Sequence, residues 1–295
     1  MRTVYLGTSE FAAAVLARLA DSPHRPALVV TRPDRPRGRG RKLGSPPVAD
    51  LARELGIELT QPDTVNDEAA LATIARARPD AVCVCAFGAL IREPLLSAFP
   101  MLNVHPSLLP RWRGAAPIER AIMSGDARTG VSIIQLTEGL DSGPVCAQAI
   151  EPIAADDTYG SLAPRLEAVG ADLLIRVLGE SPPYIPQDDA LATYATKIAP
   201  EDRVLDPARS AEELERTVRA LTPHIGAHVV LPDGDRLGVR EARIIPAGGP
   251  APGELSFEGP RPVLGCAQGA LELLVVQPPG RRAMSGEDYL RGRPR

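Results

Sequence analysis

Short apolar runs alternate with stretches of helical spacing through the first third of the chain. Four of these runs are predicted β-strands, at residues 3–6, 27–31, 81–86 and 102–104. Ser9 is placed to cap a helix that continues through Ala20, and the apolar spacing predicts further helices at 48–55 and 68–78. Strands that alternate with helices in this way are typical of an α/β fold with a mostly parallel sheet.

The middle of the chain continues with two strands, a loop and a long helix. The runs at 131–136 and 144–150 are predicted strands on either side of a glycine-flanked loop. Leucine and valine recur at helical spacing through residues 158–178, which predicts an amphipathic helix. The segment 181–189 reads Ser-Pro-Pro-Tyr-Ile-Pro-Gln-Asp-Asp, and its prolines indicate a linker.

The pattern changes beyond this linker. Residues Ser210 to Glu213 read Ser-Ala-Glu-Glu, which is a capping box, and a helix is predicted to continue to Leu221. From Gly226 onward, short alternating runs are separated by glycine turns, as is typical of a small antiparallel barrel. We therefore expect the 295 residues to form two domains, at 1–180 and 205–295, joined by a linker at 181–204.

Composition is that of an ordinary globular protein. Apolar residues make up 44% of the chain and charged residues 24%. No apolar run approaches the ~20 residues of a transmembrane helix. The N-terminal residues lead directly into the first predicted strand, so no leader peptide is expected. We expect a cytoplasmic protein that has no membrane partner.

The four cysteines do not follow a metal-binding pattern. They are Cys83, Cys85, Cys146 and Cys266. The first two alternate along an apolar run and so share one face of a strand, whereas a zinc site typically has Cys-x-x-Cys spacing and a second pair. We interpret all four as small buried hydrophobic residues of a reducing compartment, and we expect no metal.

Positive charge is concentrated in one loop. The net charge of −4 does not indicate a nucleic-acid binder, but six basic residues and one acid lie between Arg32 and Lys42. The basic residues that no apolar residue interrupts are Arg35, Arg37, Arg39, Arg41 and Lys42. We expect a loop without regular structure, because such a segment cannot bury itself. It is either a local anion-binding site or a solvated loop with no partner, and its charge alone does not decide between them.

Two short segments hold the candidate chemistry. Asn103 and His105 lie in the run Asn-Val-His-Pro-Ser-Leu-Leu-Pro, where alternate residues project to the same side of an extended segment. Asp141 lies in the second segment, Gly-Leu-Asp-Ser-Gly. An imidazole handles protons, an amide donates to a developing oxyanion, and a carboxylate orients the imidazole. The three groups therefore suit the transfer of an acyl group from a carrier to an amine.

Each of these residues also has an ordinary structural interpretation. Asn103 could cap an Asx turn, and Asp141 could be a turn residue between its glycines, so both stay open on this evidence. His105 could be a structural histidine, but it follows a predicted parallel strand, where α/β proteins place their sites, and this favours catalysis. Gly7 lacks the Gly-x-Gly-x-x-Gly pattern, which disfavours dinucleotide binding.

The same segments resemble the methionyl-tRNA formyltransferase family. The resemblance rests first on residues 103–118, Asn-Val-His-Pro-Ser-Leu-Leu-Pro-Arg-Trp-Arg-Gly-Ala-Ala-Pro-Ile. It includes Gly139-Leu-Asp-Ser-Gly143, Gly7-Thr-Ser-Glu-Phe-Ala12 and Thr193-Tyr-Ala-Thr-Lys197. The basic insertion and the run Arg-Trp-Arg-Gly-Ala-Ala-Pro-Ile narrow the likeness from formyltetrahydrofolate enzymes in general to the tRNA enzyme.

This resemblance implies a Rossmann-like catalytic domain followed by an OB-like barrel that contacts tRNA. The implied reaction moves a formyl group from 10-formyltetrahydrofolate to the α-amine of methionyl initiator tRNA, on a monomeric enzyme. His105 and Asn103 are then expected to stabilise the oxyanion. Asp141 is expected to orient His105 and to help relay the amine proton.

The resemblance also implies two binding regions. The expected lining of the folate pocket is Ser107, Leu108, Leu109 and Pro110, together with Phe87 and Gly88. The basic loop is expected to reach the acceptor end of tRNA, because arginine suits phosphates and splayed bases. Its contacting residues would be Arg35, Arg37, Arg39, Arg41 and Lys42.

Two departures from the family and two alternative functions accompany this interpretation. Pro223-His-Ile-Gly226 stands where the family often carries a Pro-Trp-Pro-Gly-like turn, and the C-terminal region is close to neutral where the family is often basic. One alternative is another formyltetrahydrofolate enzyme, acting on glycinamide ribonucleotide, an amino sugar or water. The other is a noncatalytic RNA- or nucleotide-binding protein, which would use the basic loop but would not need His105.

Overall fold

The computed structural model describes residues 1–37 and 42–292. The chain divides into two compact units. The first consists of Met1–Gly114, Thr129–Pro152 and Ala163–Tyr194. The second consists of Ala115–Arg128, Ile153–Leu162 and Ala195–Arg295.

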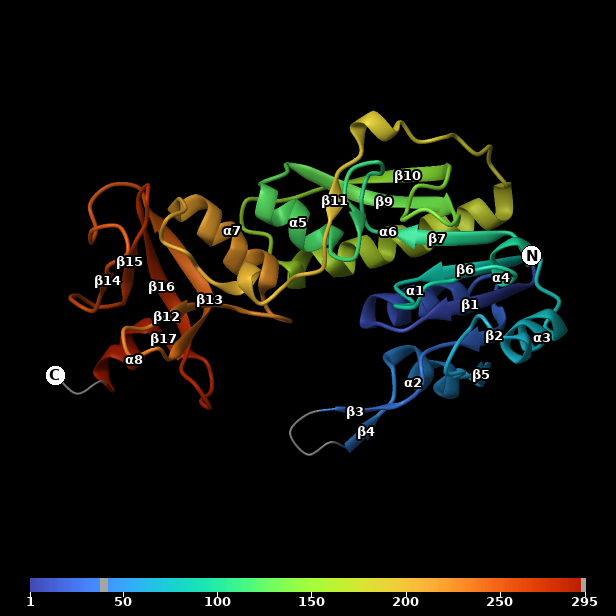
Figure 1. The fold of residues 1–295 in the computed structure, drawn as a ribbon, viewed down its shortest axis with the longest axis horizontal. Coiled ribbons are helices and arrows are strands. Elements are labelled where there is room, and N and C mark those ends of the chain that lie inside the picture. The colour runs from blue at the N-terminus through green and yellow to red at the C-terminus, as the bar shows by residue number, and fades with distance from the viewer. Residues whose placement is uncertain (38–41, 293–295) are drawn as a thin grey trace. The chain divides into compact units, whose positions relative to one another are not determined.

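A seven-stranded sheet forms the centre of the first unit, in the order β10-β9-β7-β6-β1-β2-β5 (Figure 1). Its strands are β1 (Thr3–Gly7), β2 (Pro26–Val30), β5 (Glu58–Thr60), β6 (Ala81–Cys85), β7 (Met101–His105), β9 (Arg128–Gln135) and β10 (Val145–Pro152). The strands from β5 to β7 are mutually parallel, whereas β9 runs antiparallel to β7. The predicted mostly parallel sheet is therefore confirmed.

The chain reverses its direction of travel across this sheet. From β1 it moves outward to β2 and β5, and it then returns to β6 on the other side of β1. Such a switch point leaves a crevice at the carboxyl ends of the strands, where α/β proteins bind their ligands. Every residue of β1, β6 and β7 is buried, which explains why these segments read as continuous apolar runs.

The longer helices of the first unit begin and end close to the predicted positions. They are α1 (Glu10–Ala20), α2 (Pro47–Glu54), α3 (Glu68–Arg76) and, from Ala163 onward, α6 (Tyr159–Glu180), whereas the short α4 (Leu95–Ala98) was not predicted. Ser9 caps α1 as expected, because its hydroxyl accepts a hydrogen bond from the amide of Ala12. Gly170 lets α6 approach the site-bearing strands, since a Cβ there would lie only 3.0 Å from Cγ1 of Val104.

The basic loop is more ordered at its two ends than the sequence predicts. β3 (Arg35–Arg37) pairs antiparallel with β4 (Lys42–Gly44), with Arg35 opposite Gly44. The expectation of an irregular loop was wrong for these residues, because extended backbone pairs through its own amides and carbonyls without apolar side chains. Arg39 and Arg41 lie outside the described residues.

The base of this hairpin is held by the loop's one acidic residue. The carboxylate of Asp34 accepts a hydrogen bond from Nε2 of Gln61 at 2.8 Å and another from the hydroxyl of Ser45 at 3.1 Å. Nε2 of Gln61 also donates to the carbonyl of Arg32 at 2.9 Å. Asp34 therefore fixes the point at which the hairpin leaves the sheet.

An antiparallel sheet forms most of the second unit, with the strand order β12-β13-β16-β15-β14 and β17 beside β16. Its strands are β12 (Ala227–Val230), β13 (Arg236–Ile245), β14 (Leu255–Ser256), β15 (Val263–Gly265), β16 (Ala270–Gln277) and β17 (Met284–Ser285). The unit also holds α5 (Pro117–Ser124), α7 (Ala211–Leu221) and α8 (Gly286–Arg291). The capping box of Ser210 and Glu213 is confirmed at the start of α7.

The four cysteines are free and buried, as the sequence predicts. Burial raises the pKa of both Cys83 and Cys85 to about 12, so these thiols stay protonated at neutral pH. Among the residues that the structure describes, no helix is long and apolar enough to cross a membrane.

Candidate active site

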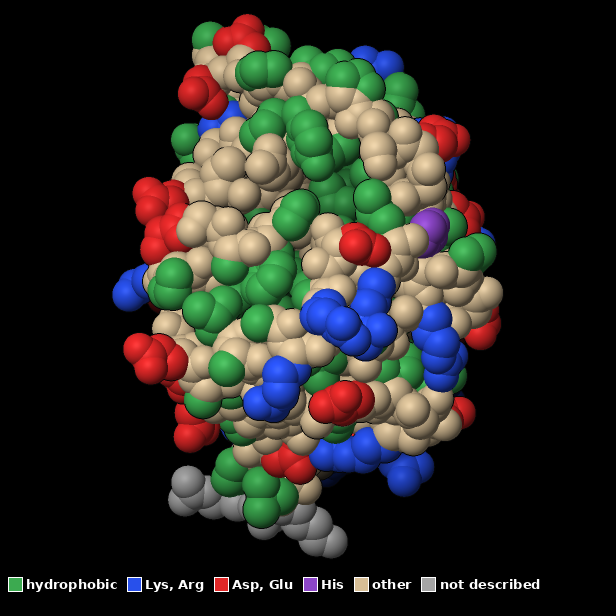
Figure 2. Space-filling model, turned by 90° about the vertical axis from the view of Figure 1, so that its right-hand side faces the viewer, with side chains coloured by type: hydrophobic (Ala, Val, Ile, Leu, Met, Phe, Trp, Pro, Cys, Tyr) green, Lys and Arg blue, Asp and Glu red, His purple; other side chains and the backbone are tan. Residues whose placement is uncertain are grey.

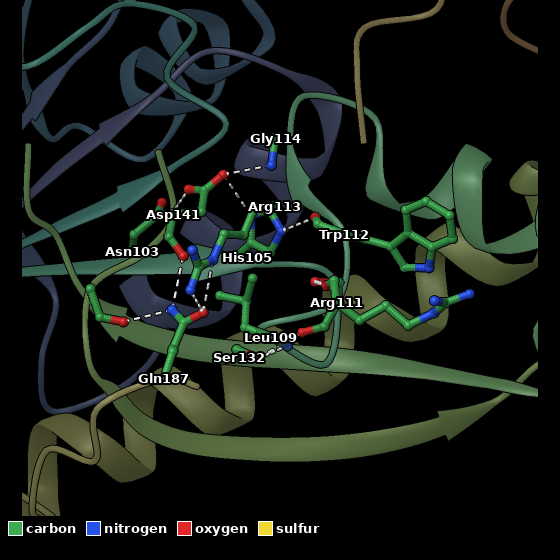
Figure 3. Close-up of polar contacts among 12 residues, drawn as sticks. Asn103, His105, Leu109, Arg111, Trp112, Arg113, Gly114, Ser132, Asp141 and Gln187 are labelled. Atoms are coloured by element: carbon green, nitrogen blue, oxygen red, sulfur yellow. Dashed lines mark hydrogen bonds and ion pairs between the residues drawn. The ribbon is translucent and has the colours of Figure 1, made fainter. Parts of the chain in front are cut away.

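Asn103, His105 and Asp141 come together at the carboxyl end of β7 (Figure 3). Asn103 and His105 lie two residues apart on this strand, and both are buried, with 8% and 4% of their surface exposed. Asp141 lies in the loop between β9 and β10, with a backbone φ of +46°. The amide, imidazole and carboxylate that the sequence singled out are therefore neighbours, at the edge of the sheet where a ligand site is expected.

The carboxylate of Asp141 is shared between three partners. Its Oδ2 atom lies 3.6 Å from Nδ1 of His105 and accepts a hydrogen bond from the backbone amide of Gly114 at 2.9 Å. Its Oδ1 atom accepts from Nδ2 of Asn103 at 3.4 Å. The side chain of Asp141 is only 14% exposed, so these interactions are partly shielded from water. They orient the carboxylate toward the imidazole.

The second ring nitrogen of His105 defines its tautomer. Nε2 lies 2.9 Å from the carbonyl oxygen of Trp112. A carbonyl only accepts hydrogen bonds, so Nε2 carries a proton. Nδ1 faces the carboxylate of Asp141 at 3.6 Å, slightly beyond hydrogen-bond length. Trp112 has a left-handed φ of +66°, which aims its carbonyl at the ring.

The segment Ser107–Pro110 is held by a buried hydroxyl that the sequence analysis did not identify. Ser132, on β9, donates to the carbonyl of Ser107 at 2.7 Å and accepts from the amide of Leu109 at 3.1 Å. Its oxygen also accepts from Nε2 of Gln148 on β10 at 2.8 Å. Ser132 therefore determines the shape of the segment predicted to line the folate pocket.

These contacts predict a stability defect when the hydroxyl of Ser132 is removed. Ser132→Ala leaves the Leu109 amide and the Ser107 carbonyl without this partner, at a position with 0% exposure. We expect the free energy of unfolding to fall by about 1–3 kcal/mol, measured by urea denaturation. Ser22→Ala is the control. It removes two hydrogen bonds of a half-buried hydroxyl, one donated to the carbonyl of Leu19 and one accepted from the amide of His24, and should cost about 1 kcal/mol or less because water can replace the lost partner there. Equal losses in the two variants would contradict the role of Ser132.

The predicted folate-lining residues differ in exposure. Leu108 and Pro110 are half-buried and offer apolar surface, whereas the side chains of Ser107 and Leu109 are buried. The side chain of Phe87 is also buried, in the apolar cluster beneath the sheet. Ser107, Leu109 and Phe87 could therefore meet a ligand only through their backbone.

Gly88 is the exposed member of this set. It follows β6 with a φ of +73°, so its backbone is open to solvent beyond the end of that strand. The neighbouring turn is tied to the end of β1, because the hydroxyl of Thr8 donates to the carbonyl of Phe87 at 2.7 Å. The carboxyl ends of β1 and β6 thus lie side by side, next to that of β7.

The structure describes only part of the predicted tRNA-contacting set. Arg35 is exposed at the start of the hairpin, and Arg37 and Lys42 lie opposite one another in its strands. Figure 2 shows one face of the molecule, on which Lys and Arg side chains gather in one area with Asp and Glu close by. Because the two signs are mixed, the charge of this face does not by itself indicate a nucleic-acid surface.

A buried arginine and a glutamine complete the surroundings of Asp141, and the sequence analysis identified neither. The side chain of Arg113 is 4% exposed and binds Gln187, which in turn binds the backbone of the Asp141 loop. Arg113 stands inside the quoted run Arg-Trp-Arg-Gly, so that motif was the available signal. No sequence pattern marked Gln187, because it lies in a segment that was predicted to be a linker. Within residues 1–37 and 42–292, no group of three or more His, Cys, Asp or Glu side chains could hold a metal ion.

A doubly wound sheet that carries an amide, an imidazole and a carboxylate at its carboxyl edge defines an acyl-transfer enzyme of the Rossmann-like class. Family models agree with this class. The model described as "Formyl transferase" matches residues 1–178, and that described as "Formyl transferase, C-terminal domain" matches residues 197–294. The chain therefore belongs to the formyl transferase family.

Curated relatives carry a more particular name. A methionyl-tRNA formyltransferase of Acidithiobacillus ferrooxidans is 45% identical over 300 residues, which cover 99% of this chain and 95% of that protein. The methionyl-tRNA formyltransferase of Gluconobacter oxydans is 40% identical over 100% of this chain and 97% of its own length. The methionyl-tRNA formyltransferase of Pseudomonas putida is 42% identical over 99% of this chain and 96% of its own length.

Solved structures show the same fold at low identity. A methionyl-tRNA formyltransferase from Clostridium thermocellum matches with a TM-score of 0.62 and 16% identity, covering 82% of this chain and 93% of that one. HypX from Aquifex aeolicus, solved with tetrahydrofolic acid, matches with a TM-score of 0.62 and 17% identity, covering 98% and 47%. An N-formyltransferase from Helicobacter canadensis, in complex with folinic acid and dTDP-3-aminofucose, matches with a TM-score of 0.68 and 13% identity, covering 92% and 98%.

Proposed function

We propose that this protein transfers the formyl group of 10-formyltetrahydrofolate to the α-amine of methionyl initiator tRNA and so makes N-formylmethionyl-tRNA for translation initiation. The observation that carries this proposal is kinship over the full length of the chain. Relatives at 40–45% identity, aligned over 99–100% of it, are named methionyl-tRNA formyltransferase. The cluster of Asn103, His105 and Asp141 supplies the groups that such a transfer needs.

The chemistry begins with a neutral amine. An α-amino group has a pKa of ~8, so a useful fraction is unprotonated at physiological pH and able to attack the formyl carbon. Attack forms the new carbon–nitrogen bond and places negative charge on the formyl oxygen. The bond to N10 then breaks, and the proton lost by the amine is returned to N10. A site that binds the tetrahedral oxyanion more tightly than the ground states accelerates this sequence.

The hydrogen-bond geometry supports a different role for each nitrogen of His105. Nδ1 faces Asp141, whose carboxylate would orient the ring. Nε2–H is the proton that points away from Asp141, toward the carbonyl of Trp112. We propose that the oxyanion takes the place of this carbonyl when substrate binds, while the Asn103 amide donates to the same oxygen. Asp141 holds the ring and assists the proton relay.

The folate would lie against the half-buried surface of Leu108 and Pro110, near the exposed backbone of Gly88. Ser107, Leu109 and Phe87 would shape the pocket rather than bind the ring, since their side chains are buried and their backbone groups are hydrogen-bonded to Ser132 and Thr8. A rigid segment suits a flat ring, because little freedom is lost when the ligand binds. Ser132 supplies that rigidity through its three hydrogen bonds.

The finer organisation is also part of the proposal. We propose a catalytic domain at 1–180, a linker at 181–204 and a tRNA-contacting domain at 205–295, with an OB-like arrangement of the antiparallel sheet. The proposed enzyme is a cytoplasmic monomer. The two family models, which match residues 1–178 and 197–294, support this division.

The basic hairpin is proposed to hold the acceptor end of the tRNA, through Arg35, Arg37, Arg39, Arg41 and Lys42. The double variant Arg39→Ala/Arg41→Ala should weaken tRNA binding and leave folate binding unchanged. For every phosphate that the variant no longer neutralises, the slope of log affinity against log salt should fall by about 0.7–0.9. Filter binding of methionyl-tRNA at several salt concentrations measures this slope.

A matched control separates local contact from bulk charge. Arg76→Ala/Arg92→Ala removes two exposed charges elsewhere on the first unit. It should leave the salt dependence as in wild type. If the slope of log affinity against log salt were the same for wild type and Arg39→Ala/Arg41→Ala, these arginines would not contact the tRNA.

The experiment that tests the function is the formation of N-formylmethionine. The purified protein is incubated with 10-formyltetrahydrofolate and methionyl initiator tRNA, and the amino acid is released by mild base and analysed by mass spectrometry. Formylated methionine is the expected product. Tight binding of tRNA without any formylated product would instead support a noncatalytic RNA-binding protein.

A further inference from the structure

Residues 181–194, which lie within the predicted linker, are hydrogen-bonded at both ends to segments next to the candidate site. Ile185 and Val145 exchange backbone hydrogen bonds at 2.8 and 2.9 Å, so the segment begins as an addition to the edge of β10. At its other end, Thr193 accepts from the amides of Trp112 and Arg113, at 2.9 Å each, and donates to the carbonyl of Pro110 at 3.3 Å. Residues 181–194 belong to the first compact unit. They connect the segment that follows β7, at Pro110–Arg113, with the region of the Asp141 loop and β10.

Gln187 is the side chain of this segment that reaches the Asp141 loop. Its Nε2 donates to the carbonyl of Asp141 at 2.8 Å and to the carbonyl of Gly143 at 2.7 Å (Figure 3). Its Oε1 accepts from Nε of Arg113 at 3.0 Å and from Nη2 at 2.9 Å. All the polar atoms of the amide are therefore engaged, on the backbone of one loop and on the buried side chain of the other.

The Asp141 backbone needs such support. Its φ of +46° lies in the left-handed region, which is unfavourable for a residue with a Cβ and persists only where the surroundings enforce it. The same backbone conformation turns the carboxylate toward Nδ1 of His105 and the amide of Gly114. Gln187 clamps the carbonyl of the residue itself and that of Gly143, two residues further on.

We infer that Gln187 is a positioning residue for formyl transfer, which holds the backbone of Asp141 so that its carboxylate faces His105, with Arg113 holding the Gln187 amide in turn. This inference rests on the proposed function. A small displacement of an orienting group slows chemistry far more than it weakens binding, because binding surfaces elsewhere are unchanged. Among the described residues, the hydrogen bonds of the Gln187 amide go to Asp141, Gly143 and Arg113, so it acts on the imidazole through Asp141.

Three substitutions test the inference. Gln187→Leu removes the donors and the acceptor at similar volume. Gln187→Glu keeps oxygen atoms for Arg113 but removes the N–H donors to the Asp141 loop. Asp189→Asn is the matched control, because Asp189 is 82% exposed and accepts a hydrogen bond at 2.7 Å from the same Nη2 of Arg113 that donates to Gln187. Thermal melting of each variant identifies any that fails to fold.

We expect kcat for formyl transfer to fall by about 10–100-fold in Gln187→Leu and in Gln187→Glu, with KM for folate and for methionyl-tRNA within about twofold of wild type. Asp189→Asn should keep both parameters within about twofold. A role in stability alone would instead lower the melting temperature and leave kcat per folded enzyme unchanged. That result, or equal kcat in Gln187→Glu and wild type, would overturn the inference.

A second readout separates failure of this inference from failure of the proposed function. The ring ¹⁵N chemical shifts of His105 in the ligand-free protein report the contacts of both ring nitrogens and need no acceptor. They should move in Gln187→Leu and stay in place in Asp189→Asn. Unchanged shifts in Gln187→Leu would overturn the positioning role even if wild type turned over. Absent turnover in wild type with shifted signals in Gln187→Leu would uphold the geometry and refute the substrate.

Discussion

His105→Ala should slow formyl transfer by about three orders of magnitude while the protein remains folded and binds folate. The imidazole carries a proton on Nε2, which is proposed to face the oxyanion, and a carboxylate lies beside its other nitrogen. Losing a proton donor of this kind typically costs roughly 10²–10⁴-fold in rate, because the oxyanion loses a hydrogen-bond donor that was already in position. Single-turnover transfer with saturating folate measures the chemical step directly.

His24→Ala is the matched control for this variant. His24 is a half-buried histidine of the same unit that binds the N-terminal amine at 3.0 Å, and it should be dispensable for transfer. Binding of unreactive 5-formyltetrahydrofolate, measured by calorimetry, should be similar in both variants. A rate for His105→Ala within tenfold of wild type would contradict the catalytic role. His105 would then be a structural residue that holds the Trp112 carbonyl.

Asp141→Asn should lower the rate of transfer by about two to three orders of magnitude with little change in KM. The amide is nearly the same size and still accepts the hydrogen bond from Gly114, so the loop should keep its conformation. It loses the negative charge that faces Nδ1 of His105, and with it the carboxylate that orients the imidazole. Steady-state kinetics with methionyl-tRNA separate the two parameters.

The neighbouring loop residue Glu138 provides the control for charge. Glu138 is exposed to solvent, and Glu138→Gln removes its charge without changing its size. It should leave kcat unchanged. If Asp141→Asn raised KM and left kcat intact, Asp141 would be a binding residue rather than the partner of His105.

The sheet of the first unit was predictable because its central strands are buried on both faces. β1, β6 and β7 contain only buried residues, so their burial is visible in the sequence as apolar runs. Two helix starts were predictable for a different reason. Ser9 and Ser210 satisfy the first backbone amides of α1 and α7, and this local chemistry leaves a sequence signature.

The short elements were harder to predict. α5 spans eight residues and was not predicted, and the ends of the basic hairpin pair without apolar side chains. In both cases local periodicity is too brief to identify the structure. The antiparallel character of the second sheet followed from its glycine turns and alternating runs, whereas its strand order depends on contacts between distant segments.

The site was predictable in its chemistry but not in its supports. Asn103 and His105 stand two residues apart on one strand, and a motif marks Asp141. Arg113 and Gln187 are separated by 74 positions, and Ser132 and Leu109 by 23. A single sequence carries no local pattern for such pairs, so only the folded chain shows that Gln187 supports Asp141 and that Ser132 shapes the segment at 107–110.

Fold alone does not identify the acceptor. Structures at 13–17% identity that share this fold include one with tetrahydrofolic acid and one with an amino-sugar nucleotide. A shared scaffold can host different substrates, so the acceptor must be decided by the site and by closer kinship. Relatives at 40–45% identity over the whole chain are named methionyl-tRNA formyltransferase, which favours methionyl-tRNA as the acceptor.

The most direct test of the proposed activity is formyl transfer from 10-formyltetrahydrofolate with the acceptor varied. Methionyl initiator tRNA, glycinamide ribonucleotide, an amino-sugar nucleotide and water are compared side by side, with wild type and His105→Ala. We predict transfer to the methionyl-tRNA alone, abolished in His105→Ala. Efficient transfer to one of the other acceptors, or transfer to methionyl-tRNA that survives His105→Ala, would contradict the proposed function.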